Sequence, residues 1–330
     1  MKSKKPFSKD IILLDNIEAV IENIVRKMRE DVLDRFKRKG AVVGISGGVD
    51  SSVCLALSVM AFGADKVTGL ILPEKDSSPD SEVLANALGH ALGVQTIKEE
   101  ITGALSGFQC YKRRDEAVKR LFPEYDPRIW KMKIGIRQSG LFSNLPPVFM
   151  VTIHDREGIQ KDRILPVNEY LQIVAASNFK QRTRMSMLYY HAESLHYAVV
   201  GTPNKHEKEQ GFFVKFGDGA GDVMPIANLY KTQVYQLAEF LDIPKEIIER
   251  TPTTDTYPAE QTQEEFFYQF PFDQMDLYWY GFENGYPPAE VAEVMGETGE
   301  RVEALFRGFE RRRNTTEYMR TGPVSDYWNG

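Results

Sequence analysis

The sequence of 330 residues contains little cysteine, little histidine and no excess of basic charge. Its two cysteines, Cys54 and Cys110, form no Cys-x-x-Cys pair, which argues against a zinc site and against a disulfide framework. Among the five histidines only His191 and His196 are close along the chain, and residues five apart do not share a helix face. We therefore expect no metal site built on cysteine or histidine, and we assign catalysis to no histidine.

An excess of positive charge and long apolar runs are also missing. The 41 Lys and Arg residues are outnumbered by 47 Asp and Glu residues, whereas proteins that bind nucleic acid more often carry basic charge in excess. No apolar segment is long enough to cross a bilayer, and the basic start of the chain lacks the apolar stretch of a signal peptide. We expect a cytoplasmic protein with no nucleic-acid partner and no membrane partner.

Apolar runs and amphipathic segments alternate along much of the chain. Apolar residues recur at helical spacing from 11 to 39 and stop at Gly40, where a fully apolar run begins. Strands are expected at 41–45, 67–72, 95–99 and 198–202, and helices between them at 53–60, 81–92 and 178–195. This alternation predicts an α/β fold with a doubly wound parallel sheet.

Two segments depart from the alternation. Residues 105–176 contain several prolines, charged clusters and one strand-like run at 148–153, and we interpret them as an insertion that forms a lid or a subunit contact. The core is then expected at 1–104 and 177–262, followed by a helical C-terminal extension at 263–330. The aromatic-rich start of that extension is typical of a core or a subunit interface. A helix-turn-helix pattern follows, but acidic residues outnumber basic ones there, which argues against DNA binding.

The stretch from Ser46 to Ser52, Ser-Gly-Gly-Val-Asp-Ser-Ser, lies between the first expected strand and a helix. Gly47 and Gly48 allow a tight turn in which backbone N–H groups converge on an anion. The hydroxyls of the three serines add donors, and the N-terminus of the following helix favours negative charge. The stretch lacks the Gly-Lys-Ser/Thr ending of a Walker A loop and the G-x-G-x-x-G of a dinucleotide fold. We predict a phosphate-binding loop at the carboxyl end of the sheet.

This loop resembles the SGGxDS pyrophosphate loop of ATP pyrophosphatases, which cleave ATP between its α and β phosphates to adenylate a carboxylate or carbonyl oxygen. Further stretches follow in order along the chain, and the whole set resembles NAD synthetase: they lie at 178–189, 200–207, 211–219, 225–234 and 251–255. No glutaminase domain precedes them, so the resemblance is to the short form that uses free ammonia. The fold that it implies is that of the adenine nucleotide alpha hydrolases.

The resemblance implies a reaction and a set of substrates. ATP would adenylate the nicotinate carboxylate of nicotinic acid adenine dinucleotide, and ammonia would then displace AMP to give NAD. The catalytic residues implied are Asp50, Asp218 and Lys231, and Mg²⁺ would be held by Asp50 and Glu207. The ATP-binding residues implied are Ser46, Gly47, Gly48, Asp50, Ser51, Ser52, Thr202, Lys231 and Thr253. The dinucleotide-binding residues implied are Arg182, Tyr189, Lys215 and Asp218, and the protein is expected to be a homodimer.

Three departures from the family pattern bear on the acid that is amidated. The segment 105–176 is longer than the family's usual connector, and Pro203 stands where many members have glycine. Residues 317–323 lack the His-Lys pair that the family carries near its end, for which residues 311–313, three arginines, are a candidate replacement. A second interpretation therefore stays open, in which the same adenylation and amidation act on another carboxylate in a specialised biosynthetic pathway.

Overall fold

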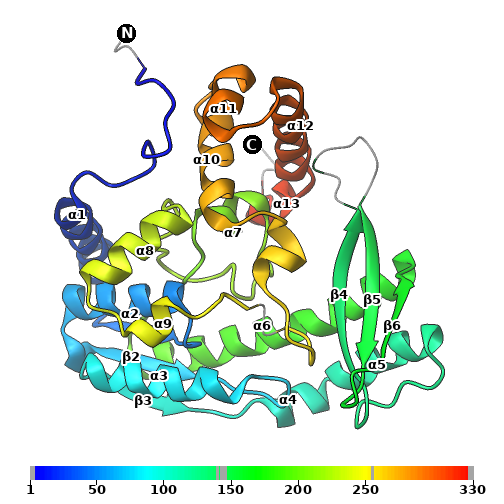
Figure 1. Cartoon of the computed structure of the whole chain (residues 1–330). Coiled ribbons are helices and arrows are strands. Elements are labelled where there is room, and N and C mark those ends of the chain that lie inside the picture. The colour runs from blue at the N-terminus through cyan, green and yellow to red at the C-terminus, as the bar shows by residue number, and fades with distance from the viewer. Residues whose placement is uncertain (1–3, 139–140, 142–146, 254–255, 326–330) are drawn as a thin grey trace.

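The structure, a computed structural model, describes residues 4–138, 141, 147–253 and 256–325. Its centre is a four-stranded sheet in the order β3-β2-β1-β7, in which every pair of neighbours is parallel. The strands are β1 (Ala41–Gly44), β2 (Val67–Ile71), β3 (Gln95–Lys98) and β7 (Ala198–Val200). The predicted parallel α/β sheet is therefore confirmed (Figure 1).

Helices cover both faces of this sheet, as a doubly wound fold requires. On one face, Ala41 and Val43 pack with α1 (Ile17–Arg29), α2 (Val49–Phe62), α3 (Pro79–Ala91) and α8 (Lys231–Phe240). On the other face, Val42 and Leu70 pack against α4 (Thr102–Gly107), α5 (Cys110–Leu121) and α6 (Val167–Leu195). Alternate residues of a strand point to opposite faces, so both hydrophobic cores are anchored on the same short strands.

Two of the expected helices begin elsewhere. The helix expected from residue 11 begins at Ile17, where Asn16 accepts a hydrogen bond from the backbone N–H of Ala19, and it continues as η1 (Glu30–Arg35). The helix expected from 178 begins at Val167, directly after Pro166, so residues 167–176 form its first turns. Short helices also occur at η2 (Ala64–Lys66), α7 (Lys205–Gln210) and α9 (Lys245–Ile248).

Residues 105–176 contain regular structure that is continuous with the core. The strands β4 (Lys131–Gln138), β5 (Val148–His154) and β6 (Gln160–Ile164) form an antiparallel meander, which stands to one side of the parallel sheet in Figure 1. Helix α5 packs along α6, and its Cys110 and Tyr111 join the core on that face of the sheet. The part of this segment before the meander is thus built into the sheet's covering layer.

A cluster of buried charges fastens α5 and α6 to the loop that follows β2. The ammonium of Lys180 lies 2.8 Å from Glu74 Oε1 and 2.8 Å from Asp76 Oδ2. Arg114 of α5 reaches Asp76 at 2.6 Å, and Tyr111 donates to Glu74 at 2.8 Å. Burial raises the pKa of Asp76, but Arg114 and Lys180 outweigh that effect and the pKa is lowered. Asp76 is therefore held ionised inside the protein.

The C-terminal part is helical and has its own aromatic core. It contains η3 (Glu264–Tyr268), α10 (Phe272–Glu283), α11 (Pro288–Met295), α12 (Gly299–Thr315) and α13 (Glu317–Arg320). The buried rings of Tyr268, Trp279 and Phe309 pack there with Phe7, which comes from the start of the chain. The aromatic stretch expected to form a core or a subunit interface thus lies largely inside a core. No helix in the described part of the chain is long and apolar enough to span a membrane.

Substituting Lys180 by methionine should lower the free energy of unfolding by about 3 kcal/mol, because Glu74 and Asp76 then stay buried without their shared cation. Chemical denaturation measures the change. Arg26→Met is the matched control, since its pair with Glu30 is exposed and should contribute less than about 0.5 kcal/mol. Equal effects of the two substitutions would contradict a structural role for the buried cluster.

Candidate active site

The phosphate loop is shaped by a tight turn at its centre. Gly47 adopts a φ of 72°, and a Cβ there would lie 2.9 Å from the carbonyl oxygen of Ser81, so only glycine fits. Gly48 is the N-cap of α2, and its carbonyl accepts the hydroxyls of Ser51 at 3.0 Å and Ser52 at 2.8 Å. The loop therefore presents the N-terminus of α2, a 14-residue helix, to a pocket at the carboxyl edge of the sheet.

Most of the residues expected to bind ATP line this one pocket, which encloses about 650 Å³ including its open mouth. The sequence-predicted residues found there are Ser46, Gly48, Asp50, Ser51, Thr202, Glu207, Lys231 and Thr253. Gly47 is not among the lining residues but shapes the loop by its turn. Ser52 does not line the pocket either. Ser52 is fully buried, and both its hydroxyl and its N–H point to the carbonyl of Gly48.

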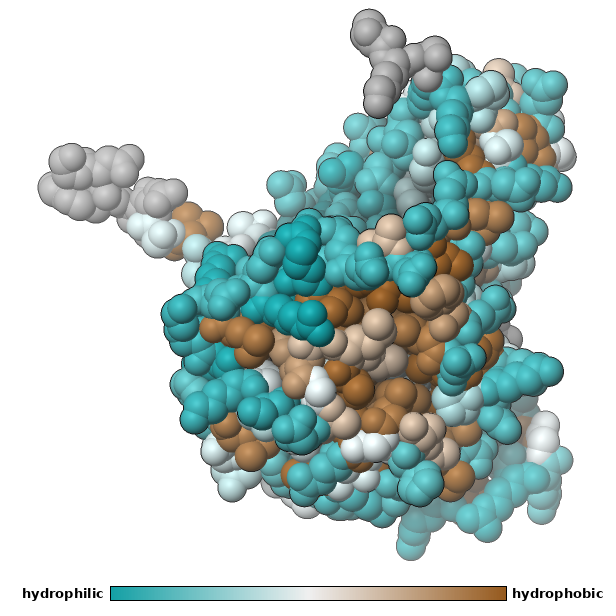
Figure 2. All heavy atoms as spheres, turned by 90° about the vertical axis from the view of Figure 1, so that its left-hand side faces the viewer, coloured by the Kyte–Doolittle hydropathy of each residue, from teal (hydrophilic) through white to brown (hydrophobic). Residues whose placement is uncertain are grey.

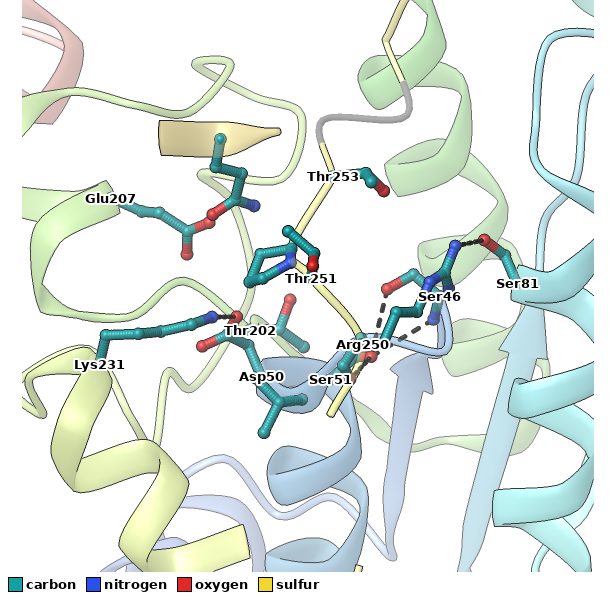
Figure 3. Close-up of a pocket in the computed structure, with 14 residues that line it drawn as sticks. Ser46, Asp50, Ser51, Ser81, Thr202, Glu207, Lys231, Arg250, Thr251 and Thr253 are labelled. Atoms are coloured by element: carbon teal, nitrogen blue, oxygen red, sulfur yellow. Dashed lines mark hydrogen bonds and ion pairs between the residues drawn. The ribbon is translucent and has the colours of Figure 1, made fainter. Parts of the chain in front are cut away.

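Asp50 and Lys231 form an ion pair across the pocket, between the second residue of α2 and the first residue of α8 (Figure 3). The side chain of Lys231 is completely buried. Burial alone would lower the pKa of its ammonium, but the carboxylates of Asp50 and Glu207 outweigh this and raise it. The second oxygen of Asp50 accepts from the Asn204 side chain at 3.3 Å. Lys231 is thus a fixed positive charge inside the pocket.

Glu207 faces the same pair from α7. Its Oε2 accepts the N–H of Asn204 at 2.9 Å, and Asn204 Oδ1 accepts the N–H of Glu207 at 3.1 Å, so the two residues cap the helix reciprocally. Burial, reinforced by the nearby charge of Asp50, raises the pKa of Glu207 to about 8. Two carboxylates that repel each other beside a phosphate loop offer the oxygen ligands that Mg²⁺ prefers.

Protein ligands alone do not complete a metal cage here. Among the described residues no group of three or more His, Cys, Asp and Glu side chains is arranged to hold a metal ion. Mg²⁺ is commonly bound by one or two carboxylates together with substrate phosphates, and Asp50 and Glu207 fit that pattern.

The pocket also contains a basic residue that the sequence did not predict. Arg250 donates to the Ser81 hydroxyl at 3.0 Å, and its Nη1 lies 3.3 Å from the place of a Cβ on Gly47. It stands opposite the Lys231 pair, with Thr202 and Thr251 between them (Figure 3). Its position directly before the Thr251-Pro252-Thr253 stretch is the signal that could have identified it.

The residues expected to bind the dinucleotide do not line this pocket. Arg182 donates to the carbonyl of Lys215 at 3.3 Å, and the ammonium of Lys215 binds the carbonyls of Tyr318 and Thr321, each at 2.7 Å. The Tyr189 hydroxyl donates to Asp222 at 3.2 Å, and burial with the charge of Asp222 raises its pKa to about 12. These contacts join α6, the loop 211–222 and the C-terminal segment in one region.

Asp218 lies in that loop and also influences the pocket. Its Oδ1 accepts the N–H of Val214 at 2.7 Å. Burial raises the pKa of its carboxyl to about 6, against the lowering effect of backbone N–H groups and Arg184. The charge of Asp218 also raises the pKa of Glu207, so Asp218 lies near one of the two candidate metal ligands. Asp218 thus belongs to the loop that carries Lys215, and its charge acts on Glu207 in the pocket.

The fold and the pocket define a class of protein. A parallel sheet whose first strand runs through an SGGxDS loop into a helix, with a lysine and two carboxylates facing that loop, is the arrangement that the resemblance to ATP pyrophosphatases implies. The chain belongs to the NAD synthase family, whose sequence model matches residues 20–132 and 149–323. That match includes the C-terminal helices and most of 105–176, and it leaves 133–148 unmatched.

Curated relatives carry a name that agrees with this assignment. The chain is 46% identical over 307 residues to the NH(3)-dependent NAD(+) synthetase of Mesorhizobium japonicum, covering 93% of this chain and 95% of that protein. It is 44% identical over 317 residues to the protein of the same name from Rhizobium meliloti, covering 96% of this chain and 94% of that protein.

Solved structures share the fold at lower sequence identity. The NMN synthetase from Francisella tularensis superposes with a TM-score of 0.62 at 22% identity, covering 95% of this chain and 99% of the other. The NH3-dependent NAD synthetase from Campylobacter jejuni gives a TM-score of 0.62 at 18% identity, covering 94% and 99%. The two names differ in the product, so the shared fold by itself does not identify the acid that is amidated.

The substitution Glu207→Gln should stabilise the metal-free protein at pH 8. The folded carboxyl of Glu207 keeps its proton up to a pKa of about 8, so folding becomes less favourable as pH rises above the ordinary glutamate pKa. Glutamine keeps the bond to Asn204 and has no charge to bury. We expect a melting temperature higher by roughly 2 °C at pH 8 and no difference near pH 4.

Thermal unfolding with a chelator present, at both pH values, measures the effect. The control is Glu22→Gln, since Glu22 is exposed on α1 and should leave the melting temperature unchanged at either pH. A destabilised Glu207→Gln protein at pH 8 would contradict the buried, proton-holding carboxyl.

Proposed function

We propose that this protein is an ammonia-dependent NAD synthetase. In the first step an oxygen of the nicotinate carboxylate of nicotinic acid adenine dinucleotide attacks the α-phosphorus of ATP, and the bond to the β-phosphate breaks to release pyrophosphate. In the second step ammonia attacks the acyl carbon, AMP leaves, and a proton from the nitrogen passes to a base. The observation that carries the proposal is the ion pair of the buried Lys231 with Asp50 at the SGGVDSS loop, in a chain 46% identical to a protein named for this activity.

The pocket supports binding of ATP through its triphosphate. The N-terminus of α2 and the hydroxyls of Ser46 and Ser51 lie on one side, and Arg250 adds positive charge beside Gly47. These groups suit the β and γ phosphates, which leave together as pyrophosphate. Thr202 and Thr253 line the remaining wall and are assigned to the rest of the nucleotide.

Lys231 is assigned to the reacting phosphate. Its ammonium is buried and held by Asp50, so it meets the charge that accumulates on the α-phosphate without reorganising. Asp50 and Glu207 would hold Mg²⁺ together with the phosphate oxygens. When bound, the ion neutralises the leaving pyrophosphate.

Asp218 is assigned to the amidation step. Its pKa of about 6 leaves most of it ionised at neutral pH, so it can accept a proton from ammonium or from the attacking nitrogen. Arg182, Tyr189 and Lys215 lie in the same region and are assigned to the dinucleotide. The adenylate would then form between the ATP pocket and this region, with Asp218 near both.

The protein is further proposed to act as a cytoplasmic homodimer without a nucleic-acid partner. Figure 2 shows apolar side chains gathered on the face that carries α1, α2 and α8. Large apolar side chains on or beside these elements are exposed, among them Leu13, Leu33, Met60 and Phe240. A contiguous apolar surface of this kind is typical of a subunit interface.

Purified protein incubated with ATP, Mg²⁺, ammonium and nicotinic acid adenine dinucleotide should produce AMP, pyrophosphate and NAD in equal amounts. Lys231→Met should lower kcat by about 100-fold to 1,000-fold, because the charge on the reacting phosphate loses its fixed partner. Chromatography of the nucleotides measures both. Lys245→Met is the matched control, since that lysine is exposed on α9.

Formation of ADP in place of AMP would contradict the proposed chemistry. Release of AMP with another carboxylic acid, and none with nicotinic acid adenine dinucleotide, would keep the chemistry and replace the substrate.

The dimer proposal predicts a mass of twice 37.6 kDa by light scattering at micromolar concentration. The double substitution Met60→Glu with Phe240→Glu should yield a monomer, because it places charges on the apolar face. Ile164→Glu, on the exposed edge strand of the meander, is the control and should leave the mass unchanged. A monomeric wild-type protein would contradict the proposal.

A further inference from the structure

A chain of buried polar side chains runs from the C-terminal helices to the first turn of α8. We call it the polar chain, and it consists of Arg312, Gln210, His206 and Asp276. Arg312 donates to Gln210 Oε1 at 2.7 Å, Gln210 Nε2 lies 3.0 Å from His206 Nδ1, and His206 Nε2 is hydrogen-bonded to Asp276 Oδ1. Gln210, His206 and Asp276 are fully buried.

Asp276 ends the polar chain on the backbone of α8. Its Oδ2 accepts the N–H of Thr232 at 2.7 Å, and its Oδ1 lies 3.3 Å from the N–H of Lys231. The N-cap residue of α8 is Tyr230, whose side chain cannot supply the short oxygen that usually accepts these N–H groups. A carboxylate from α10 therefore performs the capping of α8 from another part of the chain.

The direction of the hydrogen bonds is fixed from the Arg312 end. A guanidinium only donates, so Gln210 must turn its oxygen toward Arg312 and its amide nitrogen toward His206. His206 then accepts at Nδ1 and donates from Nε2 to Asp276. Every link is satisfied in one arrangement, which makes the polar chain a rigid support for the carboxylate.

The support bears on two residues of the active site. Lys231, whose ammonium pairs with Asp50, is the first residue of α8, and its own N–H is one of the groups that faces Asp276. His206 directly precedes Glu207 on α7. The polar chain thus joins the start of α8 and the start of α7, which carry the cation and a carboxylate of the pocket.

We propose that Asp276 is a positioning residue for the adenylation step: by capping α8 it holds Lys231 in place. Asp276 is itself held in position by His206, Gln210 and Arg312. The inference rests on the proposed function, because Lys231 is the group whose place matters. A role in stability alone could be met by Ser, Asp or Asn at position 230, yet the cap comes from the C-terminal helices. The C-terminal helices thereby become part of the catalytic apparatus.

The test compares Asp276→Asn with Asp276→Ala. Asparagine keeps one acceptor, so we expect kcat for NAD formation to fall by about 100-fold with asparagine and further with alanine, while KM for ATP changes little. Hydrogen exchange of the peptide that spans 229–236 should become faster in both variants. An Asp276→Asn protein that folds and keeps the wild-type kcat would overturn the inference.

The control removes a helix cap from a place without site residues. Asn16→Ala deletes the acceptor for the Ala19 N–H at the start of α1, so it should lower the melting temperature and leave kcat unchanged.

If neither Asp276 variant folds, Arg312→Met tests the inference at the far end of the polar chain. We expect a severalfold lower kcat and faster exchange of the same peptide, and no change in either would overturn the inference.

Failure of the proposed function can be told apart from failure of this inference. If the wild-type protein makes no NAD, acetylation of Lys231 by an amine-reactive reagent still reports its placement. The buried Lys231 should resist labelling in the wild type and become labelled in Asp276→Asn. Equal labelling of Lys231 in the two proteins would overturn the inference whatever the substrate is.

Discussion

The ion pair between Lys231 and Asp50 is the interaction on which the site depends. A buried ammonium is costly, and here two carboxylates offset the loss of hydration. Burial, reinforced by the charge of Asp50, raises the pKa of Glu207 to about 8. This balance requires α2 and α8 to be packed against each other at the edge of the sheet, and the hydrophobic core on that face provides the packing.

The C-terminal helices contribute more than a cover. Their aromatic core encloses the polar chain, and the dry surroundings strengthen each of its hydrogen bonds. Lys215 and Arg320 attach the last helix to the loop 211–219 and to α7 through backbone carbonyls. The segment that lacks the family's His-Lys pair is therefore fastened to this loop and to α7 by other basic side chains.

Local patterns predicted the parts of the fold in which neighbours along the chain decide the structure. The strand pattern and the glycine turn of the phosphate loop were read from short stretches and are confirmed. The start of α6 was placed at 178 instead of Val167, because its first turns pack on α5 and no local signal marks that contact. Ser52 carries a hydroxyl that could bind phosphate, yet its position in the first turn of α2 directs its donors to the carbonyl of Gly48.

The sequence by itself determined that this chain forms a parallel α/β sheet with a glycine-turn loop after its first strand, since φ preference, helix capping and hydrophobic periodicity act over a few residues. Tertiary structure decided which charges share the pocket. Arg250 and Asp276 lie about 200 residues or more from the loop, and only packing brings the first beside Gly47 and the second onto the end of α8. Electrostatic interactions depend on distance in space, and a single sequence does not contain those distances.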